Sequence, residues 1–560
     1  MENGKFKSNR ESATNLKNNY TMKKIISITI FLTLGTISSV FAQNEIIPAD
    51  SLRKDLGQLL TIIEASHPDP YLSGGGKIAF HRRYQNIVNS LPLEGLTKSE
   101  FYSLILPFIA SIGDSHTGLL PNQQPGQESG LPFKFKTVEK SLFVQSIPDK
   151  KLESLLGAKL ISIENIPFEE LVNRQGNIRG AENYYTKLIF MQYLSFGKKD
   201  GLNKLIPEWE SNTPLKISFK NGDGNIENIE ISIPHQASEI ITQPSKYTLP
   251  STDKADFAYS FLDDKKQTAL LVIKDMSKYR EGFEDLKARS YNGIDQMAAS
   301  VYQNYNSTPV PDDWNKILEG IPSATEVFVN LIEEMKKANT KNLIIDLRDN
   351  TGGNSIMREL LIYLLYGNNA LNKLDNGYSI KKYSELYFSQ YDNGLKDSIN
   401  NSGSVYDFRN ENFYLGKGHV YNYDEIFKGM PTFWKVYNSK KFHIQYCKLS
   451  SVIVLSSPFT YSSGLNLLTG LYSVGAKVVG TPSGQAPNNF GDVLMFNLKQ
   501  SGIKGFVSFK QNITYPDDVE RGNCFIPDFP LTEQKYKDLN HDPNAEIHLG
   551  LEIINTRKNQ

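Results

Sequence analysis

The chain has 560 residues, and its 61 basic and 61 acidic side chains leave no formal net charge at neutral pH. Hydrophobic residues make up 39% of the chain, and it contains 40 glycines, 26 prolines and 2 cysteines. This composition excludes collagen-like, low-complexity, disulfide-stapled and wholly disordered proteins, and the length is enough for about three folded cores. Without a long basic stripe, nucleic acid is also disfavoured as a partner, because binding it depends on neutralising several phosphates.

Residues Met22 to Ala42 are typical of a secretory signal peptide. Two lysines precede an apolar stretch over residues 25–37, and small residues end at Ala42. The alternative is a membrane anchor, but the apolar run is shorter than the ~20 residues that span a bilayer. We therefore expect residues 1–42 to be leader and signal peptide. The mature protein is then secreted or periplasmic, without a membrane span.

The first part of the mature chain, residues 43–125, predicts a helical N-terminal domain. Thr97 and Glu100 have the spacing of a capping box, and the apolar run 101–112 follows them. Upstream, five apolar residues fall on one face of a 3.6-residue period: Leu52, Leu56, Leu59, Leu60 and Ile63.

Residues 131–240 have the alternating pattern of strands and predict a compact β-rich module. Asn221 to Gly224 are typical of a hairpin turn between two of its strands. A helical insertion is expected near residues 181–206.

From residue 256 to 540, short apolar strands alternate with amphipathic helices, which predicts an α/β core with a parallel sheet. The expected strands are 269–273, 342–347, 451–457 and 476–480. Two long stretches, 279–322 and 370–445, are predicted to be irregular and to form a lid or a substrate-facing insertion. We expect residues 541–560 to be a C-terminal tail.

Three segments of the chain carry residues suited to catalysis. The first is Gly113 to Thr117, with the sequence GDSHT, at the end of a predicted helix. Its His116 has a side chain suited to moving protons near neutral pH. The alternative is that His116 is an ordinary surface or packing residue.

The second segment, Ile344 to Asn354, runs from a buried strand into a glycine pair. Gly352 and Gly353 leave backbone N–H groups open at the carboxyl end of a strand, where an oxyanion can be held. The alternative is a tight turn that requires glycine. In that case three charged residues form a structural ion-pair group: Asp346, Arg348 and Asp349.

The third segment, Val452 to Leu468, places Ser462 between a buried strand and an apolar helix. The free N–H groups at the start of a helix favour a developing negative charge, which suits a nucleophile. The alternative is that Ser462 only caps the helix.

The remaining reactive residue types give no sign of a metal or cofactor. The eight histidines are scattered, and no HExxH motif or Cys/His cluster occurs. We therefore expect neither a metal site nor a cofactor. Cys447 and Cys524 lie far apart, and they form either one disulfide or two buried thiols.

Taken together, the segments GDSHT, LIIDLRDNTGG and FTYSSGLNLL, the last followed by KVVGTPSG, resemble three signature blocks of one family. These are the C-terminal processing (tail-specific) and tricorn-core serine peptidases, and the order is the same. The resemblance covers roughly residues 48–540. It implies a multidomain α+β fold with a helical N-terminal domain, a PDZ-like module over 131–240 and a crotonase/ClpP-like peptidase core over 256–540.

The resemblance also implies roles for individual residues. Ser462 matches the nucleophile, and the amide of Ser463 together with Gly352 or Gly353 matches the oxyanion hole. C-terminal processing members use a lysine base after VVG, but residues 481–486 here contain no lysine. Tricorn-type members use a Ser-His pair, which Ser115 and His116 match, and a later glutamate. We predict Glu520 for that orienting acid, with Asp517 and Asp518 as rivals.

The function implied is a serine endopeptidase that cleaves peptides or unfolded proteins through an acyl-enzyme. Two alternatives stay open. In one, the core is inactive and the PDZ-like module binds extended peptides by strand addition, a possibility that the missing lysine favours. In the other, the core hydrolyses a non-peptide ester or thioester, because a fold does not dictate its substrate.

Overall fold

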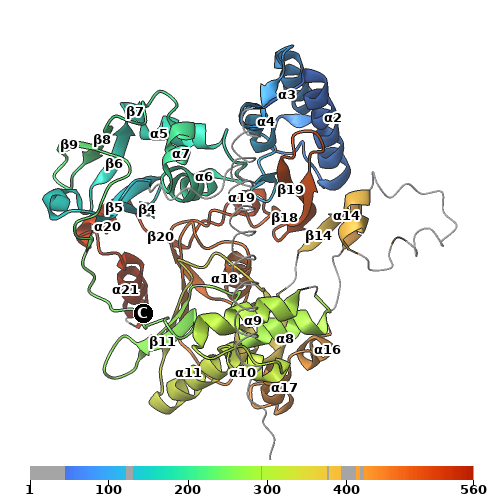
Figure 1. Ribbon diagram of the computed structural model, residues 1–560. Coiled ribbons are helices and arrows are strands. Elements are labelled where there is room, and N and C mark those ends of the chain that lie inside the picture. The colour runs from blue at the N-terminus through green and yellow to red at the C-terminus, as the bar shows by residue number, and fades with distance from the viewer. Residues whose placement is uncertain are drawn as a thin grey trace, which may run out of the picture.

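The computed structural model describes residues 45–120, 130–291, 293–374, 377–391, 396, 412–415 and 422–558. The predicted signal peptide, Met22 to Ala42, lies outside these residues. Within them, no helix combines the length and the apolar character needed to cross a membrane. The chain has a mixed α and β fold, with a helical, a β-rich and an α/β region (Figure 1).

The helical region begins with α2 (Ala49–Ser66), α3 (Gly76–Ser90) and α4 (Lys98–Ala110). The capping box predicted at Thr97 and Glu100 is confirmed at the start of α4. The predicted apolar face of α2 is buried in a cluster that also contains Leu494 and Val507 from the far end of the chain. The helices therefore do not form a core by themselves.

Their partner is a sheet whose strand order is β15-β14-β19-β18, with β3 paired to β19. In Figure 1 the blue helices α2 to α4 lie beside the red strands β18 and β19. The GDSHT segment lies between α4 and β3, so this packing fixes the position of His116. The strands are β3 (Gly118–Leu119), β14 (Tyr378–Lys382), β15 (Asn412–Leu415), β18 (Asn489–Asn497) and β19 (Lys504–Ile513).

The β-rich region is a second sheet with the order β10-β5-β6-β8-β9, to which β4 and β7 add at β5 and β6. The predicted hairpin turn is confirmed, because Gly224 N donates to Asn221 O between β8 and β9. The helical insertion is also confirmed by α6 and α7. The elements are β4 (Lys134–Val138), β5 (Ser141–Ile147), β6 (Lys159–Ile163), β7 (Ile166–Pro167), α5 (Phe168–Gln175), α6 (Tyr184–Phe190), α7 (Lys199–Leu205), β8 (Leu215–Lys220), β9 (Ile226–Ile231) and β10 (Ile241–Thr242).

The α/β region is built on a six-stranded sheet with the order β11-β12-β13-β16-β17-β20. All neighbouring pairs from β12 to β20 are parallel, and β11 is antiparallel to β12. The strands are β11 (Phe257–Phe261), β12 (Thr268–Ile273), β13 (Asn342–Asp346), β16 (Ser451–Ser456), β17 (Lys477–Gly480) and β20 (Phe529–Pro530). The four strands predicted from apolar runs are thus confirmed.

Helices cover both faces of this sheet, which explains why its strands are apolar without alternation. On one face Leu343 and Ile345 pack with α11 (Ala324–Ala338), α12 (Ile356–Tyr366) and α18 (Ser463–Ser473). On the other face Ile344 and Ile453 pack with α21 (Ala545–Lys558). The turn between β16 and α18 therefore has a rigid base.

Two predicted irregular segments and the predicted tail are wrong in the described residues. Residues 279–322 contain α8 (Arg280–Ala288), α9 (Ile294–Tyr305) and α10 (Trp314–Glu319), which share an apolar cluster of their own. Within 370–445, β14 belongs to the sheet beside the helical region. The tail prediction for 541–560 failed because α21 carries apolar residues all round instead of on one stripe, so its sequence shows no helical period.

The structure also resolves two alternatives. Cys447 and Cys524 are free thiols and not a disulfide. Asp346 and Arg348 do form an ion pair, with side chains 2.6 Å apart and buried, and this pair is compatible with an oxyanion role for the glycines. Arg348 also contacts Glu546 of α21 at 2.7 Å, so this network fastens the last helix to the sheet.

Candidate active site

Ser462 occupies the turn between β16 and α18 in an unusual backbone conformation. Its φ is 51° and its ψ is −121°, a region that residues other than glycine rarely adopt. Its side chain makes no capping hydrogen bond to the helix, although it stands at the N-cap position. The capping alternative is therefore wrong, and the hydroxyl has no hydrogen-bond partner in the described parts of the chain.

The glycine pair lies directly against this turn. A Cβ atom added to Gly352 would lie 2.7 Å from Ser462 Cβ and 3.0 Å from Ser463 N, so the close approach requires glycine. The amide of Gly352 is already used, because it donates to Asn350 Oδ1 at 3.0 Å. This leaves the next glycine as the available donor.

Gly353 and Ser463 hold their amides open. Within the described parts of the chain, neither N–H donates to a protein acceptor. The two residues are held together by the Ser463 hydroxyl, which donates to Gly353 O at 2.6 Å. Two unengaged N–H groups beside a serine hydroxyl have the character of an oxyanion hole.

Gln485 supports the same turn from the loop after β17. Its Oε1 accepts a hydrogen bond from Ser462 N at 2.5 Å, and its side chain is buried. Gln485 lies in the stretch 481–486, where the resemblance leads one to look for a lysine. A neutral amide cannot accept the proton of Ser462 as a base, so Gln485 positions the turn instead.

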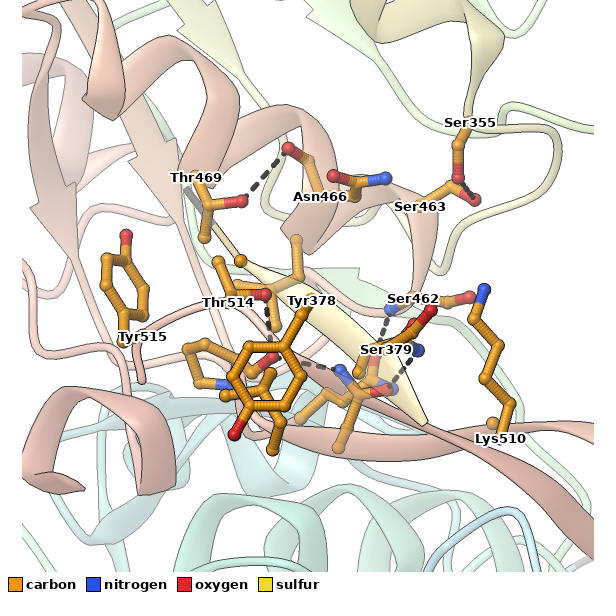
Figure 2. A pocket seen from close by; sticks show the side chains of 18 of the residues that line it. Ser355, Tyr378, Ser379, Ser462, Ser463, Asn466, Thr469, Lys510, Thr514 and Tyr515 are labelled. Atoms are coloured by element: carbon orange, nitrogen blue, oxygen red, sulfur yellow. Dashed lines mark hydrogen bonds between the residues drawn. The ribbon is translucent and has the colours of Figure 1, made fainter. Parts of the chain in front are cut away.

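His116 faces the cavity that contains Ser462. This cavity has a volume of about 1180 Å³, and His116, Ser462, Ser463, Gly353 and Gln485 all line it. Figure 2 shows the part of the cavity around Ser462 and Ser463. The His116 side chain is 26% exposed, and no hydrogen bond joins it to Ser462 in this conformation. Four of the residues predicted from separate segments thus meet at one cavity.

Asp114 fixes the loop that carries His116. Its buried carboxylate accepts hydrogen bonds from His116 N at 2.8 Å, Thr117 Oγ1 at 2.6 Å and Ser508 Oγ at 2.7 Å. It also lies 3.2 Å from Nε2 of buried His67. Burial alone would raise the pKa of Asp114, but the hydrogen bond and charge of His67 outweigh it and hold the pKa below its usual range.

Glu182 is a site residue that the sequence did not reveal. Ser115 Oγ donates to Glu182 Oε1 at 2.6 Å and lies 3.3 Å from Nδ1 of His116. The hydroxyl of Tyr461, the residue before Ser462, contacts Ser115 Oγ and donates to Glu182 Oε2 at 3.4 Å. Burial raises the pKa of Glu182, and the nearby His116 opposes that shift. A carboxylate, a hydroxyl and an imidazole thus form one connected chain.

The only local signal for Glu182 is its place before Asn183, which caps α6. That signal is common, because acidic residues often precede helices. The contact with Ser115 joins two regions 67 residues apart, so periodicity could not reveal it.

The predicted orienting acid, Glu520, is elsewhere. It lies exposed on the short helix α19 (Val519–Asn523), and its side chain contacts neither Ser115 nor His116. Its rivals Asp517 and Asp518 line the cavity, but neither bonds to that pair, and Asp518 caps α19. The prediction of Glu520 is therefore wrong in this structure, and the carboxylate that contacts Ser115 is that of Glu182.

Three of these side chains have an arrangement that could bind a metal ion. Asp114, His116 and Glu182 each offer one ligand atom, and the three atoms lie within 4.8 Å of one another. Both carboxylates already accept hydrogen bonds from the protein. The same geometry is thus satisfied by hydrogen bonds and does not require an ion.

Comparison with known proteins relates part of the chain to a peptidase family. Residues 312–488 match the model of peptidase family S41, a segment that contains Gly352, Gly353, Ser462 and Gln485. The matched segment, about a third of the chain, is similar to peptidase family S41. This match indicates a serine-type peptidase, whose substrates are peptides or proteins. No curated protein matches the chain.

The fold extends beyond the matched segment. The structure of mature CPAF complexed with lactacystin aligns with a TM-score of 0.54 and 13% sequence identity, over 91% of this chain and 99% of that one. A second structure of mature CPAF aligns with a TM-score of 0.52 and 13% identity, over 87% and 94% of the two chains. At this identity the likeness concerns the fold.

Proposed function

We propose that the protein is a secreted or periplasmic endopeptidase of the tail-specific or tricorn-core type, with Ser462 as nucleophile and His116 as base. One observation carries this proposal. The Ser462 hydroxyl does not cap its helix, and it shares a cavity with an imidazole and the unengaged amides of Gly353 and Ser463.

The proposed reaction begins when Ser462 Oγ attacks the carbonyl carbon of a peptide bond and Nε2 of His116 accepts the hydroxyl proton. The amides of Gly353 and Ser463 bind the resulting oxyanion. His116 then gives the proton to the leaving amine, and the C–N bond breaks to leave an acyl-enzyme. Water, activated by the same imidazole, hydrolyses the ester. The missing hydrogen bond between Ser462 and His116 is expected to form with substrate, as is common for catalytic pairs.

Ser115 and Glu182 are proposed to position His116. Because Ser115 Oγ donates to Glu182, its oxygen is left to accept the Nδ1–H of His116, 3.3 Å away. This tautomer puts the free lone pair on Nε2, which is the atom that must accept the proton of Ser462. The negative charge of Glu182 would also stabilise the imidazolium that forms.

The other regions receive roles from the same proposal. The β-rich region between GDSHT and the core, with α5 beside β6 and β7, supports a PDZ-like module over 131–240. The helices α2 to α4 support a helical N-terminal domain over 43–125, and the six-stranded sheet supports a peptidase core over 256–540. The pattern of Met22 to Ala42 supports secretion.

Hydrolysis of an unfolded protein by the mature chain tests the proposal. We expect Ser462→Ala to lower the rate by several orders of magnitude, because a nucleophile cannot be replaced by its neighbours. Ser439→Ala, at the exposed end of α17 (Pro431–Asn438), is the matched control and should keep the parental rate. If folded Ser462→Ala cleaves at the parental rate, the proposed function is wrong.

A further inference from the structure

Two lysines lie opposite each other in the cavity that contains Ser462. Strands β14 and β19 are antiparallel, and their register pairs Lys381 directly with Lys510. Both side chains line the cavity, and Figure 2 shows Lys510 among the side chains around it. Like charges directly opposite in an antiparallel pair destabilise a sheet. The arrangement therefore has a cost that the fold does not require.

The protein offsets only part of this positive charge. Lys510 Nζ lies 3.5 Å from Asp492 Oδ2 on β18. The ammonium of Lys381 has no hydrogen-bond or ion-pair partner among the residues that the structure describes. Burial lowers the pKa of Lys381, the charge of Lys510 lowers it further, and Asp492 opposes the shift. Two ammonium groups thus share one carboxylate.

Other acidic groups of the cavity do not complete the pair. Asp518 lies 3.6 Å from Arg521 and caps α19, and neither Asp517 nor Asp518 is among the charges that act on Lys381. A partly buried cation without a partner costs free energy unless a ligand supplies one. A second carboxylate bound between the two ammonium groups would supply it through charge-assisted hydrogen bonds.

We propose that Lys381 and Lys510 bind a carboxylate of the substrate, so that the peptidase prefers peptides with an acidic side chain near the bond it cleaves. This inference rests on the proposed function, because the cavity is a substrate site only if Ser462 is the nucleophile. The free carboxylate at the end of a peptide has the same chemistry. It is the other possible source of the bound group.

The test compares kcat/KM for matched peptides. In a peptide with an amidated C-terminus, glutamate replaces glutamine at one position at a time, within about four residues of the cleaved bond. We expect the glutamate peptide to be cleaved about tenfold faster or more at one position, the effect of one charged hydrogen bond. A third peptide has glutamine and a free carboxylate end, and a preference confined to it assigns the terminal carboxylate as the source.

Variants of the two lysines then locate the preference. Lys381→Met and Lys510→Met keep the aliphatic chain and remove the charge. We expect each variant to bring the ratio of kcat/KM for the glutamate peptide to kcat/KM for the glutamine peptide close to one. Lys504→Met is the matched control, because Lys504 is an exposed residue of the same strand outside the cavity lining. It should keep the parental ratio. Melting temperatures check that each variant is folded. Lys381→Met should not lower the melting temperature, because the substitution removes one of two like charges.

Two results overturn the inference. One is equal cleavage of the glutamate, glutamine and free-carboxylate peptides at every position, and the other is a parental preference that survives in both lysine variants. If the parent cleaves no peptide, the proposed function fails separately. Binding of fluorescent glutamate and glutamine peptides to the parent and the lysine variants then tests the carboxylate site by itself. Equal affinities of the parent for the two peptides contradict the site. A preference for the glutamate peptide that is lost in the lysine variants supports it.

Discussion

Ser462 and His116 reach one cavity from two regions that are built in different ways. Ser462 stands on the turn after a central strand of the six-stranded sheet, where its backbone, Gly352 and Gln485 fix it. His116 stands on a loop between α4 and β3, and its ring is partly exposed. The first region is rigid by local geometry, and the second is positioned by packing between distant segments.

This difference suggests a division of labour. The core supplies the proposed nucleophile and the proposed oxyanion amides in a fixed arrangement, as electrostatic preorganisation requires. The loop at Asp114 and the strands β14 and β19 supply the proposed base and the lysine pair to the same cavity. Substrate binding between the two regions is expected to bring His116 and Ser462 into hydrogen-bond contact.

Among the residues around His116, removal of its imidazole should lower kcat most. We expect His116→Ala to lower kcat by a factor between about 10² and 10⁴, the usual contribution of a general base. Its melting temperature should stay near the parental value, because the ring is partly exposed and makes one side-chain hydrogen bond, to Ser115. His443→Ala, at an exposed histidine, is the control. Parental kcat in His116→Ala would assign the base to another residue.

Variants of Glu182 and Glu520 distinguish the orienting acid proposed from the structure from the one predicted by sequence. We expect Glu182→Gln to lower kcat by about tenfold to 100-fold, the usual effect of losing a residue that orients a working imidazole. Glu520→Gln should leave kcat unchanged because its side chain is exposed and contacts neither Ser115 nor His116. The reverse result would contradict the chain from Glu182 through Ser115 to His116.

The pH dependence of stability provides a second readout for Glu182. Its pKa is raised in the folded state, mainly by burial, so the ionised form is disfavoured there. The stability that it contributes is present at low pH and is lost as the pH rises through the folded-state pKa. Glutamine does not ionise, so Glu182→Gln should melt at or above the parental temperature at pH 8. A lower melting temperature at pH 8 than the parent would contradict this.

Asp114 should affect stability more than chemistry. Its pKa is lowered in the folded state, so its contribution is present above the unfolded-state value and is lost as the pH falls through the folded-state value. We expect Asp114→Asn to destabilise the protein by about 3 kcal/mol at pH 7, as when one partner of a buried pair is removed. Chemical denaturation at pH 7 and below pH 4 should show that the difference in free energy of unfolding between the parent and Asp114→Asn is smaller in acid.

The smallest effect concerns the backbone of Ser462. The positive φ of residue 462 costs alanine conformational free energy, as it does serine, whereas glycine adopts it without that cost. Ser462→Gly should therefore be more stable than Ser462→Ala by about 1 kcal/mol, with both inactive. Equal stabilities in chemical denaturation would mean that the turn is not strained.

Local patterns were enough to predict the strands and the helix around Ser462. Uninterrupted apolar strands and the helix after Ser462 are properties of short segments, and the structure confirms their places. The predicted tail failed because α21 has no one-sided apolar stripe.

The region around His116 and the lysine pair depends on long-range contacts, which the periodicity of the sequence does not encode. Glu182 meets Ser115 across 67 residues, and Lys381 meets Lys510 only through the register of β14 on β19. Strand β14 itself lies in a stretch rich in tyrosine, asparagine and glycine, which predicted an irregular segment.

The rate at which a fluorophosphonate labels Ser462 tests the central claim most directly, because this reagent reports the activation of one hydroxyl. The labelled residue is identified by peptide mass spectrometry, and the rate is measured for the parent, His116→Ala and Lys510→Met. We predict labelling at Ser462 in the parent, a loss of at least about 100-fold in His116→Ala, and little change in Lys510→Met. Equal labelling of the parent and His116→Ala, or none at Ser462, would contradict the account.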